Sequence, residues 1–518
     1  MSRLFPSALV ALILGMLLAG NASATSYYIA ANGSDSSNGT SETTPWLHAP
    51  GMNGCSSVCA SSSPLPGDQF IFRGGDTWLT TSGVWVWSWS GGSGNAIYIG
   101  GGDQTWFNSG ACGASYCRPI VSEGGTVSKA FETASGVKWV HLDNLEWKGM
   151  FSNLSNPNSG QIDYIDLSRN TNISDANMEI SNNYLHDGNV AHDGAHNAHF
   201  ILGSLGSADA SSSLHDNVLD NSDRCTPPGP CTIDLFEGAP HIIYRNYFGY
   251  ASCGIVTDWP LLLYNNTIEW IVLSPDNGVD HENAMESNGD TNFLLFNNVV
   301  RHVYNAGIVD FQMAPVNSTS YAFNNVLPDM DGGNMQQCYE GSPANNHCSW
   351  FNNTAEAGPD SGNPSGMCGR NTGSNTTSSV TNQHCITTAT GNSWWSGTAS
   401  FTTNLSQTKA AANAEGYSNA QIYAFSPTAA NGSTVGAGTN MSSTCSTITA
   451  INAAAGAACM QDTSYGAAYD VSTHTITGAG RLSTNARPAS GAWDVGAYQF
   501  GAGDPPPNAP TGLSAVVQ

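Results

Sequence analysis

The chain has 518 residues, of which 40% are hydrophobic and only 10% are charged, and its formal net charge at pH 7 is −25. An acidic surface of this kind repels nucleic acid and anionic membranes, so we expect neither as a partner. It also offers no general attraction to a polyanionic sugar, so a neutral glycan, or an acidic one bridged by a cation, is the better match.

The first 24 residues have the features of a secretory signal peptide. Arg3 supplies the positive start, residues 8–19 form an apolar run, and Ala22-Ser23-Ala24 provides a small-residue cleavage site. We therefore expect the mature chain to begin near Thr25 and the protein to be secreted, either to the exterior or to the periplasm. No later segment is long and apolar enough to predict a membrane span.

Twelve of the 13 cysteines fall into pairs that are close in the sequence. The pairs are Cys55/Cys59, Cys112/Cys117, Cys225/Cys231, Cys338/Cys348, Cys368/Cys385 and Cys445/Cys459. In an exported protein this spacing predicts local disulfides. Zinc binding is the alternative interpretation, although no C-x-x-C pair occurs. The remaining cysteine, Cys253, is expected to be a buried free thiol.

A short pattern recurs along residues 180–355: apolar residues, one or two asparagines, then two residues that usually include a β-former. The last asparagines of the copies are Asn183, Asn217, Asn246, Asn266, Asn298, Asn325 and Asn353, at steps of 20 to 34 residues. A fixed kernel at irregular spacing predicts a solenoid whose coils differ in loop length. Asparagine tolerates a left-handed backbone at a bend, and stacked asparagines can hydrogen-bond one another.

These kernels, together with residues 27–35 and 90–99, resemble those of secreted bacterial pectate-lyase-like proteins. Residues 433–439 and 487–498 are similar to the closing coils of that group. The resemblance implies an all-β, right-handed parallel β-helix over residues 25–500, with an N-terminal cap. It says little about activity, because this architecture hosts lyases, hydrolases, esterases and adhesins. Residues 501–518 read as a Pro-rich linker followed by a truncated start that resembles a fibronectin type III module.

Successive coils of such a solenoid lie about 4.8 Å apart, so equivalent residues form columns. Alternation with apolar neighbours predicts that the strands before the kernels present one exposed column. Its members are His199, Asp234, Thr257, Glu286 and Asp310. Stacked acids repel one another unless they share a proton or bind a cation. The column is therefore either a catalytic site, since glycoside hydrolysis requires paired carboxyls, or an ordinary solvated face.

Within this column we take Asp234, Glu286, Asp310 and His199 as the candidate catalytic residues. Glu286 and Asp310 are expected on adjacent coils, with their carboxyls roughly 5 Å apart. Asp234 is expected two coils away from Glu286, which is nearer 10 Å by the same rise.

Candidate substrate-binding residues flank the column in the sequence: Asp258, Trp259, His281, Glu282 and Arg301. An indole such as that of Trp259 can stack on a sugar ring, or it can pack against the next coil.

Four histidines, His186, His192, His196 and His199, are close enough in sequence to suggest a metal site. Gly188 and Gly194 instead favour a polar loop.

The preferred interpretation is a secreted carbohydrate-active enzyme that cleaves glycosidic bonds of a polysaccharide by acid–base hydrolysis. The second is a polysaccharide lyase in which the acidic column holds Ca²⁺ to neutralise a uronate. The third is a non-catalytic glycan-binding or cell-surface β-helix. Hydrolysis requires no cofactor, whereas the lyase requires Ca²⁺. We expect a polysaccharide or oligosaccharide as the partner and a monomeric chain.

Overall fold

The computed structural model describes residues 24–501 except for short segments, and the first and last residues lie outside the described part. The omitted segments are 81–82, 123–128, 152–161, 171–174, 190–197, 204–210, 228–230, 232, 239–241, 258–261, 273–282, 289–292, 304–305, 313–318, 331–335, 341–345, 358–366, 372–375 and 388–393.

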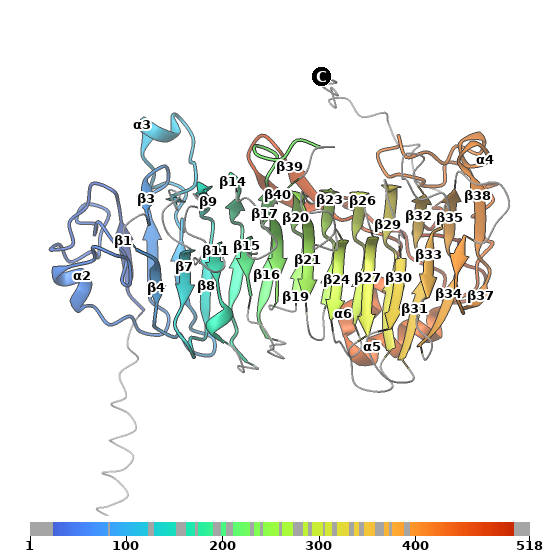
Figure 1. The fold of residues 1–518 in the computed structure, drawn as a ribbon, viewed down its shortest axis with the longest axis horizontal. Coiled ribbons are helices and arrows are strands. Elements are labelled where there is room, and N and C mark those ends of the chain that lie inside the picture. Colours follow the sequence, from blue (N-terminus) through green and yellow to red (C-terminus); the bar gives the residue numbers. More distant parts are fainter. Residues whose placement is uncertain are drawn as a thin grey trace, which may run out of the picture.

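The chain winds through three long parallel sheets, one strand per sheet on each coil, as a right-handed parallel β-helix (Figure 1). The predicted fold is therefore confirmed. Right-handed crossovers are the rule for parallel strands.

Sheet 1 has 13 strands: β1 (Ser26–Ile29), β2 (Gln69–Phe72), β5 (Ile97–Gly100), β8 (Val140–Asp143), β12 (Glu179–Ser181), β16 (Ser213–His215), β19 (Ile242–Tyr244), β22 (Leu262–Tyr264), β25 (Leu294–Phe296), β28 (Thr319–Phe323), β31 (Asn346–Phe351), β34 (Thr376–Thr381) and β37 (Ser400–Thr402). Sheet 2 has 12 strands: β3 (Thr77–Leu79), β6 (Ile120–Ser122), β9 (Glu146–Lys148), β13 (Tyr184–Leu185), β17 (Val218–Asp220), β20 (Tyr247–Ala251), β23 (Thr267–Ile271), β26 (Val299–Val303), β29 (Val326–Met330), β32 (Thr354–Ala357), β35 (His384–Thr387) and β38 (Leu405–Thr408). Sheet 3 has 11 strands: β4 (Trp85–Trp87), β7 (Lys129–Thr133), β11 (Ile162–Asp166), β15 (Ala198–Leu202), β18 (Asp234–Glu237), β21 (Cys253–Thr257), β24 (Asn283–Asn288), β27 (Ala306–Gln312), β30 (Gln336–Glu340), β33 (Gly369–Asn371) and β36 (Trp395–Ser396).

The smaller elements are peripheral to these sheets. They are the parallel pair β10 (Met150–Phe151) and β14 (Gly188–Asn189), the antiparallel hairpin β39 (Ala467–Asp470) and β40 (Thr475–Ala479), the helices α2 (Ser57–Ser61), α3 (Ser109–Cys112), α4 (Lys409–Ala414), α5 (Ser442–Ile451) and α6 (Ala453–Cys459), and the 3₁₀ turn η1 (Ser168–Asn170).

The bend between sheets 1 and 2 is built by the asparagine kernels. The last asparagine of each copy is fully buried, and its side chain accepts from the backbone N–H of the asparagine one coil earlier. These contacts run from Asn183 through Asn217, Asn246, Asn266, Asn298 and Asn325 to Asn353, at 2.9 to 3.0 Å. The ladder therefore satisfies buried polar groups on every coil that it crosses, as predicted.

The residue before each ladder asparagine adopts the left-handed backbone that the bend requires. These residues are Asn182, Asp216, Arg245, Asn265, Asn297, Asn324 and Asn352, with φ between 52° and 60°. Five are asparagine and one is aspartate, the residue types that tolerate this region best. The two halves of the kernel therefore have separate tasks: one makes the turn and the other satisfies the polar groups inside it.

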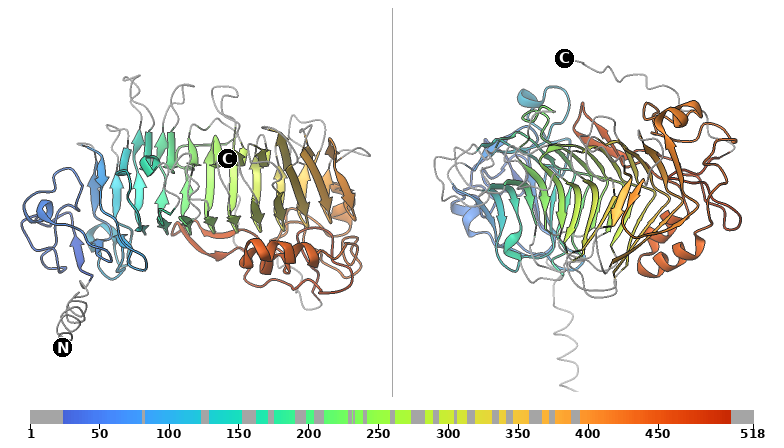
Figure 2. Two further views of the ribbon diagram at one scale, coloured as in Figure 1. Left: turned by 90° about the horizontal axis from the view of Figure 1, so that it is seen from below. Right: turned by 45° about the vertical axis from the view of Figure 1, so that its right-hand side comes forward.

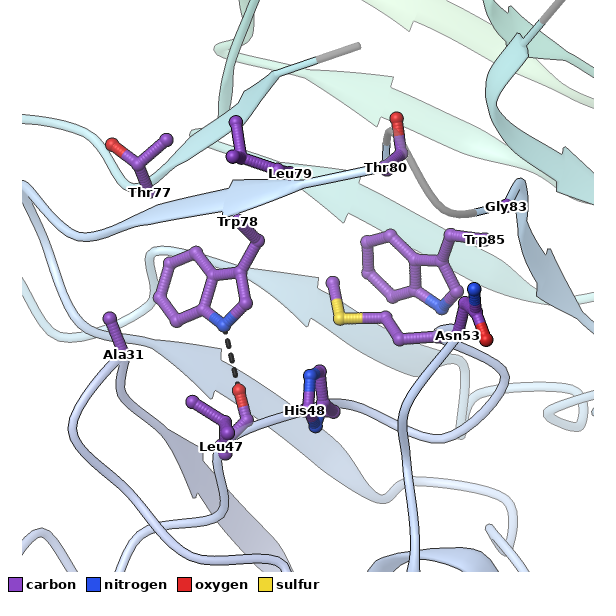
Figure 3. A pocket seen from close by; sticks show the side chains of 11 residues that line it. Ala31, Leu47, His48, Asn53, Thr77, Trp78, Leu79, Thr80, Gly83 and Trp85 are labelled. Carbon is purple, nitrogen blue, oxygen red and sulfur yellow. Dashed lines mark hydrogen bonds between the residues drawn. The ribbon is translucent and has the colours of Figure 1, made fainter. Parts of the chain in front are cut away.

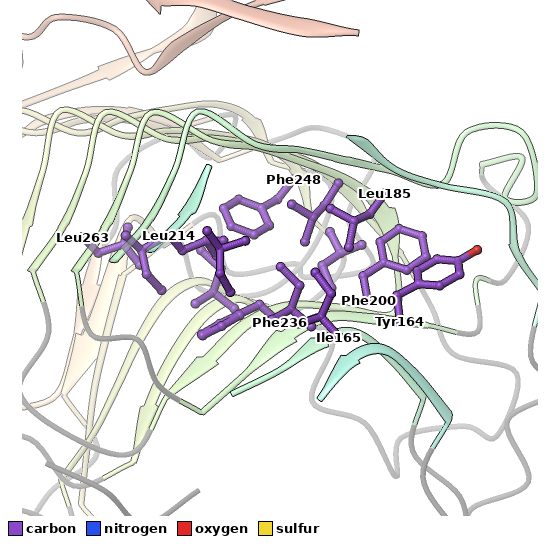
Figure 4. Packing of buried hydrophobic residues seen from close by; sticks show 14 of the residues in the cluster. Tyr164, Ile165, Leu185, Phe200, Leu214, Phe236, Phe248 and Leu263 are labelled. Atoms are coloured by element: carbon purple, nitrogen blue, oxygen red, sulfur yellow. The ribbon is translucent and has the colours of Figure 1, made fainter. Parts of the chain in front are cut away.

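The core fills the space between the three sheets. Leu214 and Leu263 contribute from sheet 1, Leu185 and Phe248 from sheet 2, and Phe236 from sheet 3, all without solvent exposure (Figure 4). Removing aromatic and branched side chains from water drives folding, because each fully buried one contributes about 1.5–3 kcal/mol.

An N-terminal cap closes the first coils. The Trp85 and Trp87 side chains are buried against Phe70, Phe72 and Phe131, which is the capping role a solenoid end requires. A small pocket of about 250 Å³ remains in the cap between Trp78, Trp85 and His48 (Figure 3).

The chain leaves the coils after Thr408 and runs back outside them (Figure 2). Helices α5 and α6 cover the outer face of sheet 1, where Phe296, Phe323 and Phe351 stack. Residues 433–439 and 487–498 lie in this return segment, so the expectation that they form closing coils is wrong. Their backbone joins in an isolated antiparallel bridge between Gly438 and Trp493 instead of a parallel ladder.

All six predicted disulfides are present, and Cys253 is a buried free thiol, so the predicted pairing is confirmed. Six disulfides are typical of a protein that folds in an oxidising compartment. Among the described residues, none of the helices has the length and hydropathy needed to cross a membrane.

The ladder predicts opposite effects for two substitutions. Gln383 occupies the next ladder position, but within the described part of the chain both polar atoms of its buried side chain lack a hydrogen-bond partner. Gln383→Asn shortens the side chain to ladder length and should raise the free energy of unfolding by about 1 kcal/mol. Asn266→Ala leaves the Asn246 N–H unpaired in the interior and should lower it by about 3 kcal/mol. Denaturant unfolding measures both.

Asn431 is exposed and serves as the control for these variants. Asn431→Ala should change the free energy of unfolding by less than about 0.5 kcal/mol. Equal values for Asn266→Ala and Asn431→Ala would contradict a stabilising role for the ladder.

Candidate active site

Strands of sheet 3 repeat a four-residue pattern in which the two middle residues enter the core. The middle pairs include Ala130-Phe131, Tyr164-Ile165, Phe200-Ile201, Leu235-Phe236 and Ala284-Met285. The strand register aligns the first residues of the pattern as one column: Lys129, Asp163, His199, Asp234 and Cys253. It aligns the fourth residues as another: Glu132, Asp166, Leu202, Glu237, Val256 and Glu286. Ionisable side chains on neighbouring coils are therefore brought into contact.

An Asp–His pair lies at the centre of the first column. Asp163 on β11 and His199 on β15 are directly in register, and His199 Nδ1 is 3.0 Å from Asp163 Oδ1. Neither side chain is exposed. The second carboxylate oxygen of Asp163 is buried without a hydrogen-bond partner in the described part of the chain. Asp163 is thus positioned to fix the orientation of the imidazole.

Two carboxyls of β18 face the other ring nitrogen of His199. Glu237 Oε2 is 2.7 Å from Nε2, and Asp234 Oδ2 is 4.0 Å from it. The Glu237 approach is close but is not aligned for a linear hydrogen bond. The Glu237 side chain is 29% exposed and that of Asp234 13%, whereas His199 is fully buried. The two β18 carboxyls are therefore the groups of this cluster that an outside ligand can reach.

The charges in this cluster depend on one another. Burial alone would lower the pKa of His199, but its contacts with Asp163 and Glu237 raise that pKa well above 6.5. The close contact with His199 lowers the pKa of Glu237 from its usual value. Burial raises the pKa of Asp163. At neutral pH the arrangement is therefore an imidazolium beside an ionised Glu237.

Asp234 has a neighbour that can accommodate a proton. Ser252 Oγ lies 2.9 Å from Asp234 Oδ1 and 3.0 Å from the carbonyl oxygen of Ile233. The Ser252 hydroxyl can donate to Asp234 Oδ1 or to the Ile233 carbonyl oxygen, and when it donates to Ile233 its oxygen can accept from a protonated Asp234. The two β18 carboxyls therefore differ in surroundings, since Glu237 lies 2.7 Å from the imidazole nitrogen, whereas Asp234 lies 4.0 Å from it and also contacts the Ser252 hydroxyl.

The earlier acids of the same face are neutralised by cations. Lys129 Nζ contacts Asp166 and lies 3.4 Å from Glu132, which also pairs with Arg169 at 3.2 Å. These contacts keep Lys129 protonated, with its pKa raised although burial acts to lower it. This group is a structural ion-pair network beside the Asp163–His199 pair.

The predicted single column is wrong in its register. His199 and Asp234 do share a column, but Asp234 aligns with Cys253 and not with Thr257. Glu286 aligns with Val256 and Val309, in the column of Glu237.

Asp310 pairs in register with Ser287, so it lies one position away from Glu286. The cause is the pair of consecutive inner residues, which breaks the strict alternation assumed from the sequence. The two residues of one strand that face outward are consequently three positions apart in the sequence.

The side chain of Glu286 is buried and accepts a hydrogen bond from Asn283 Nδ2 at 2.8 Å. Strand β27, which carries Asp310, belongs to the described part of the chain, but the Asp310 side chain does not. The two residues are on adjacent strands, β24 and β27, as expected. Their roles stay predictions.

The substrate-binding candidates are distributed differently. Asp258, Trp259, His281 and Glu282 lie outside the described residues. Arg301 is on sheet 2, where its guanidinium pairs with Glu269, so the structure does not bring it to the cluster on sheet 3.

The suggested histidine metal site is not assembled in the described part of the chain. His186 lies at the end of β13 on sheet 2, between Asp223 and Glu146, whereas His199 is on sheet 3. His192 and His196 lie outside the described residues. No group of three or more His, Cys, Asp or Glu among the described residues is arranged to hold a metal ion.

Asp163 and Glu237 were missed by the sequence reasoning. Both could have been found, because residues 163–166 and 234–237 share the order of polar, two apolar and polar residues, and residues 199–201 repeat the first three positions of that order. Aligning whole four-residue units, in place of single alternating positions, would have matched Asp163 with His199 and Asp234.

No family model matches the sequence, and no curated protein is similar to it. Several solved structures are similar at low sequence identity. A GH136 lacto-N-biosidase from Eubacterium ramulus has a TM-score of 0.43 at 11% identity, covering 74% of this chain and 67% of that one. Pectate lyase Pel9A has a TM-score of 0.37 at 12% identity, covering 93% and 98%. XylC, solved with xylose, has a TM-score of 0.32 at 9% identity, covering 74% and 83%. Similarity at this level leaves reaction and substrate open.

Two buried histidines should show opposite protonation in one NMR experiment. His199 should carry protons on both nitrogens at neutral pH, because its carboxylate neighbours raise its pKa. His384 should be neutral, because burial lowers its pKa to about 4. Imidazole ¹⁵N shifts measure both, with His199→Gln and His384→Gln for assignment. A His199 that is neutral at pH 7 would contradict the ionised cluster.

The stability of the cluster should depend on pH in a direction that follows from the raised pKa. The contribution of His199 is fully present below the unfolded pKa of about 6.5 and is lost as the pH rises through the folded value. The loss of unfolding free energy in His199→Gln should therefore be largest in acidic solution and shrink in alkaline solution. A loss that does not change with pH would argue for a packing role only.

Proposed function

We propose that this protein hydrolyses glycosidic bonds of a polysaccharide, with Asp234 and Glu237 as the carboxyl pair. The observation that carries the proposal is their placement on one strand, both within 4.0 Å of the same imidazole nitrogen. Two carboxyls with different protonation are what this reaction requires. Their shared contact with one ring also supports a separation near the roughly 5 Å of retaining enzymes.

The surroundings of the two carboxyls support a different role for each. Glu237, whose pKa is lowered by His199, is the carboxylate that attacks the anomeric carbon. Asp234 is the acid: it gives its proton to the glycosidic oxygen as the bond from that oxygen to the anomeric carbon breaks. Water then attacks the glycosyl–enzyme ester, Asp234 takes its proton, and Glu237 leaves as a carboxylate.

His199 and Asp163 are positioning residues in this proposal. The imidazole is fully buried, so it acts on the substrate only through Glu237 and Asp234. Its positive charge keeps Glu237 ionised, and Asp163 holds the ring in place. Exchange of His199 should therefore alter the pH profile of turnover.

The substrate proposed is a neutral glycan, since the net charge of −25 gives no attraction to a polyanion. Asp258 and Trp259 follow β21 directly in the sequence, one coil beyond Asp234. We retain them as proposed sugar contacts, together with His281 and Glu282 from the segment before β24.

Conservative variants test the carboxyl pair. Glu237→Gln and Asp234→Asn keep the side-chain shape but remove the proton chemistry, so each should lower turnover by about 10²–10⁴-fold. Release of reducing ends from a panel of neutral and acidic polysaccharides gives the rate, and ultraviolet absorbance detects unsaturated products. Glu179→Gln, on sheet 1, is the matched control and should retain full activity.

Three other outcomes would each favour a different reaction, site or function. Unsaturated, absorbing products that require calcium would replace hydrolysis by a lyase reaction. Loss of activity in Glu286→Gln alone would return the site to the column predicted from the sequence. Binding without turnover on every polysaccharide would make the protein a glycan-binding β-helix.

A further inference from the structure

A second pocket lies where the return segment meets the early coils of sheet 2. Its volume is about 560 Å³, within the range of small-ligand sites. One wall is formed by Tyr116 and Arg118 before β6, another by Asn144 and Tyr184, and the loop between β39 and β40 covers it with residues that include His474. The pocket is on sheet 2 and is therefore separate from the cluster on sheet 3.

Specific contacts hold the hairpin loop in this position. Tyr469 Oη donates to Asp220 Oδ2 at 2.7 Å, and Arg118 Nη1 donates to the carbonyl oxygen of Thr473 at 3.4 Å. The His474 ring stacks on Tyr184 with a centroid distance of 4.2 Å. The pocket is therefore a built feature whose walls come from segments more than 300 residues apart in the sequence.

Four of the lining residues carry polar groups without a hydrogen-bond partner in the described part of the chain. They are the Nη2 group of Arg118, the hydroxyl of Tyr184, Oδ1 of Asn144 and Nε2 of His474. The Tyr184 and Asn144 side chains are 9% and 8% exposed. These four groups converge on one cavity, where a few converging polar groups on a partly apolar lining are typical of a small-ligand site.

The unpartnered groups form a mixed set of donors and acceptors. Burial lowers the pKa of His474, so its ring is neutral at pH 7. Because Tyr469 donates to Asp220, its oxygen accepts from His474 Nδ1–H, which leaves Nε2 as an acceptor. Arg118 offers a donor, Asn144 an acceptor, and the Tyr184 hydroxyl both. Sugar hydroxyls also donate and accept, which matches this set.

The charges of the lining are balanced. Arg118 is the cation of the pocket and Glu146 its anion, and Glu146 already contacts Lys148 and His186 at 3.2 Å each. A ligand with a net charge would therefore add an unbalanced charge to a partly buried site.

We propose that this pocket binds a neutral saccharide unit, as a site additional to the proposed catalytic one. The hairpin loop acts as a fixed roof over the sugar, and Arg118, Tyr184, Asn144 and His474 contact its hydroxyls. Such a site would hold a glycan on the protein without taking part in hydrolysis.

Calorimetric titration with neutral trisaccharides tests the proposal. The probes are cellotriose, xylotriose and maltotriose, with trigalacturonate as the charged comparison, all in the Glu237→Gln background to prevent turnover. At least one neutral probe should bind with a Kd below about 1 mM. Tyr184→Phe removes only the hydroxyl and should weaken binding about 3- to 10-fold. Ser115→Trp fills the pocket from an exposed position and should abolish this binding event.

Tyr244→Phe is the matched control, because Tyr244 stacks on sheet 1 outside the pocket, and it should bind as the parent does. Absence of neutral-probe binding, unchanged binding in Ser115→Trp, equal weakening in Tyr244→Phe, or binding of trigalacturonate alone would each overturn the proposal. Hydrolysis is read separately: with Glu237 restored, Ser115→Trp should retain the cleavage rate on soluble trisaccharides. The two measurements therefore distinguish a failure of saccharide binding in this pocket from a failure of the proposed hydrolysis.

Discussion

A coil that turns three times buries backbone groups at each bend, and those groups need partners. The asparagine ladder meets this need between sheets 1 and 2. Asn217 Nδ2, for example, donates to the carbonyl oxygen of Ile180 on the preceding coil and to Asn246 Oδ1 on the next coil, and that oxygen also accepts from the Asn217 N–H. The ladder also sets the relative height of successive coils, because an asparagine displaced by one residue loses its partners on both sides. The registers of sheets 2 and 3 follow from that height.

A fixed register has a chemical consequence on sheet 3. Side chains at equivalent positions are forced into contact at the inter-strand spacing, whatever their charge. Near the N-terminal end Lys129 and Arg169 compensate the acids. One coil further the compensating group is His199, an imidazole whose charge depends on its neighbours. The candidate site is thus the place where the ion-pair pattern of this face changes from permanent cations to a titratable one.

The sequence was sufficient for the fold because its signals are local. The Asn kernels and the cysteine pairs lie within a few residues of one another, so spacing alone predicts the bends and the disulfides. The site depends on which residues of neighbouring coils are paired. An error of one residue in that register changes which side chains lie next to each other. Strict alternation placed Glu286 in the column of Asp234, whereas two consecutive inner residues place it in line with Glu237. Arg301 could not be assigned from sequence either, because its partner Glu269 is defined only by strand pairing on sheet 2.

The return segment changes how the molecule behaves as a polymer. A solenoid made only of neighbouring coils is quasi-one-dimensional, so its ends can fray independently of its middle. Here Tyr469 bonds to Asp220, 249 residues earlier, and Thr473 to Arg118, 355 residues earlier. Contacts of such high sequence separation form late, because the loop they close is long. Once formed, they couple the last described residues to the early coils, so the chain becomes one cooperative unit only after its C-terminal segment has docked.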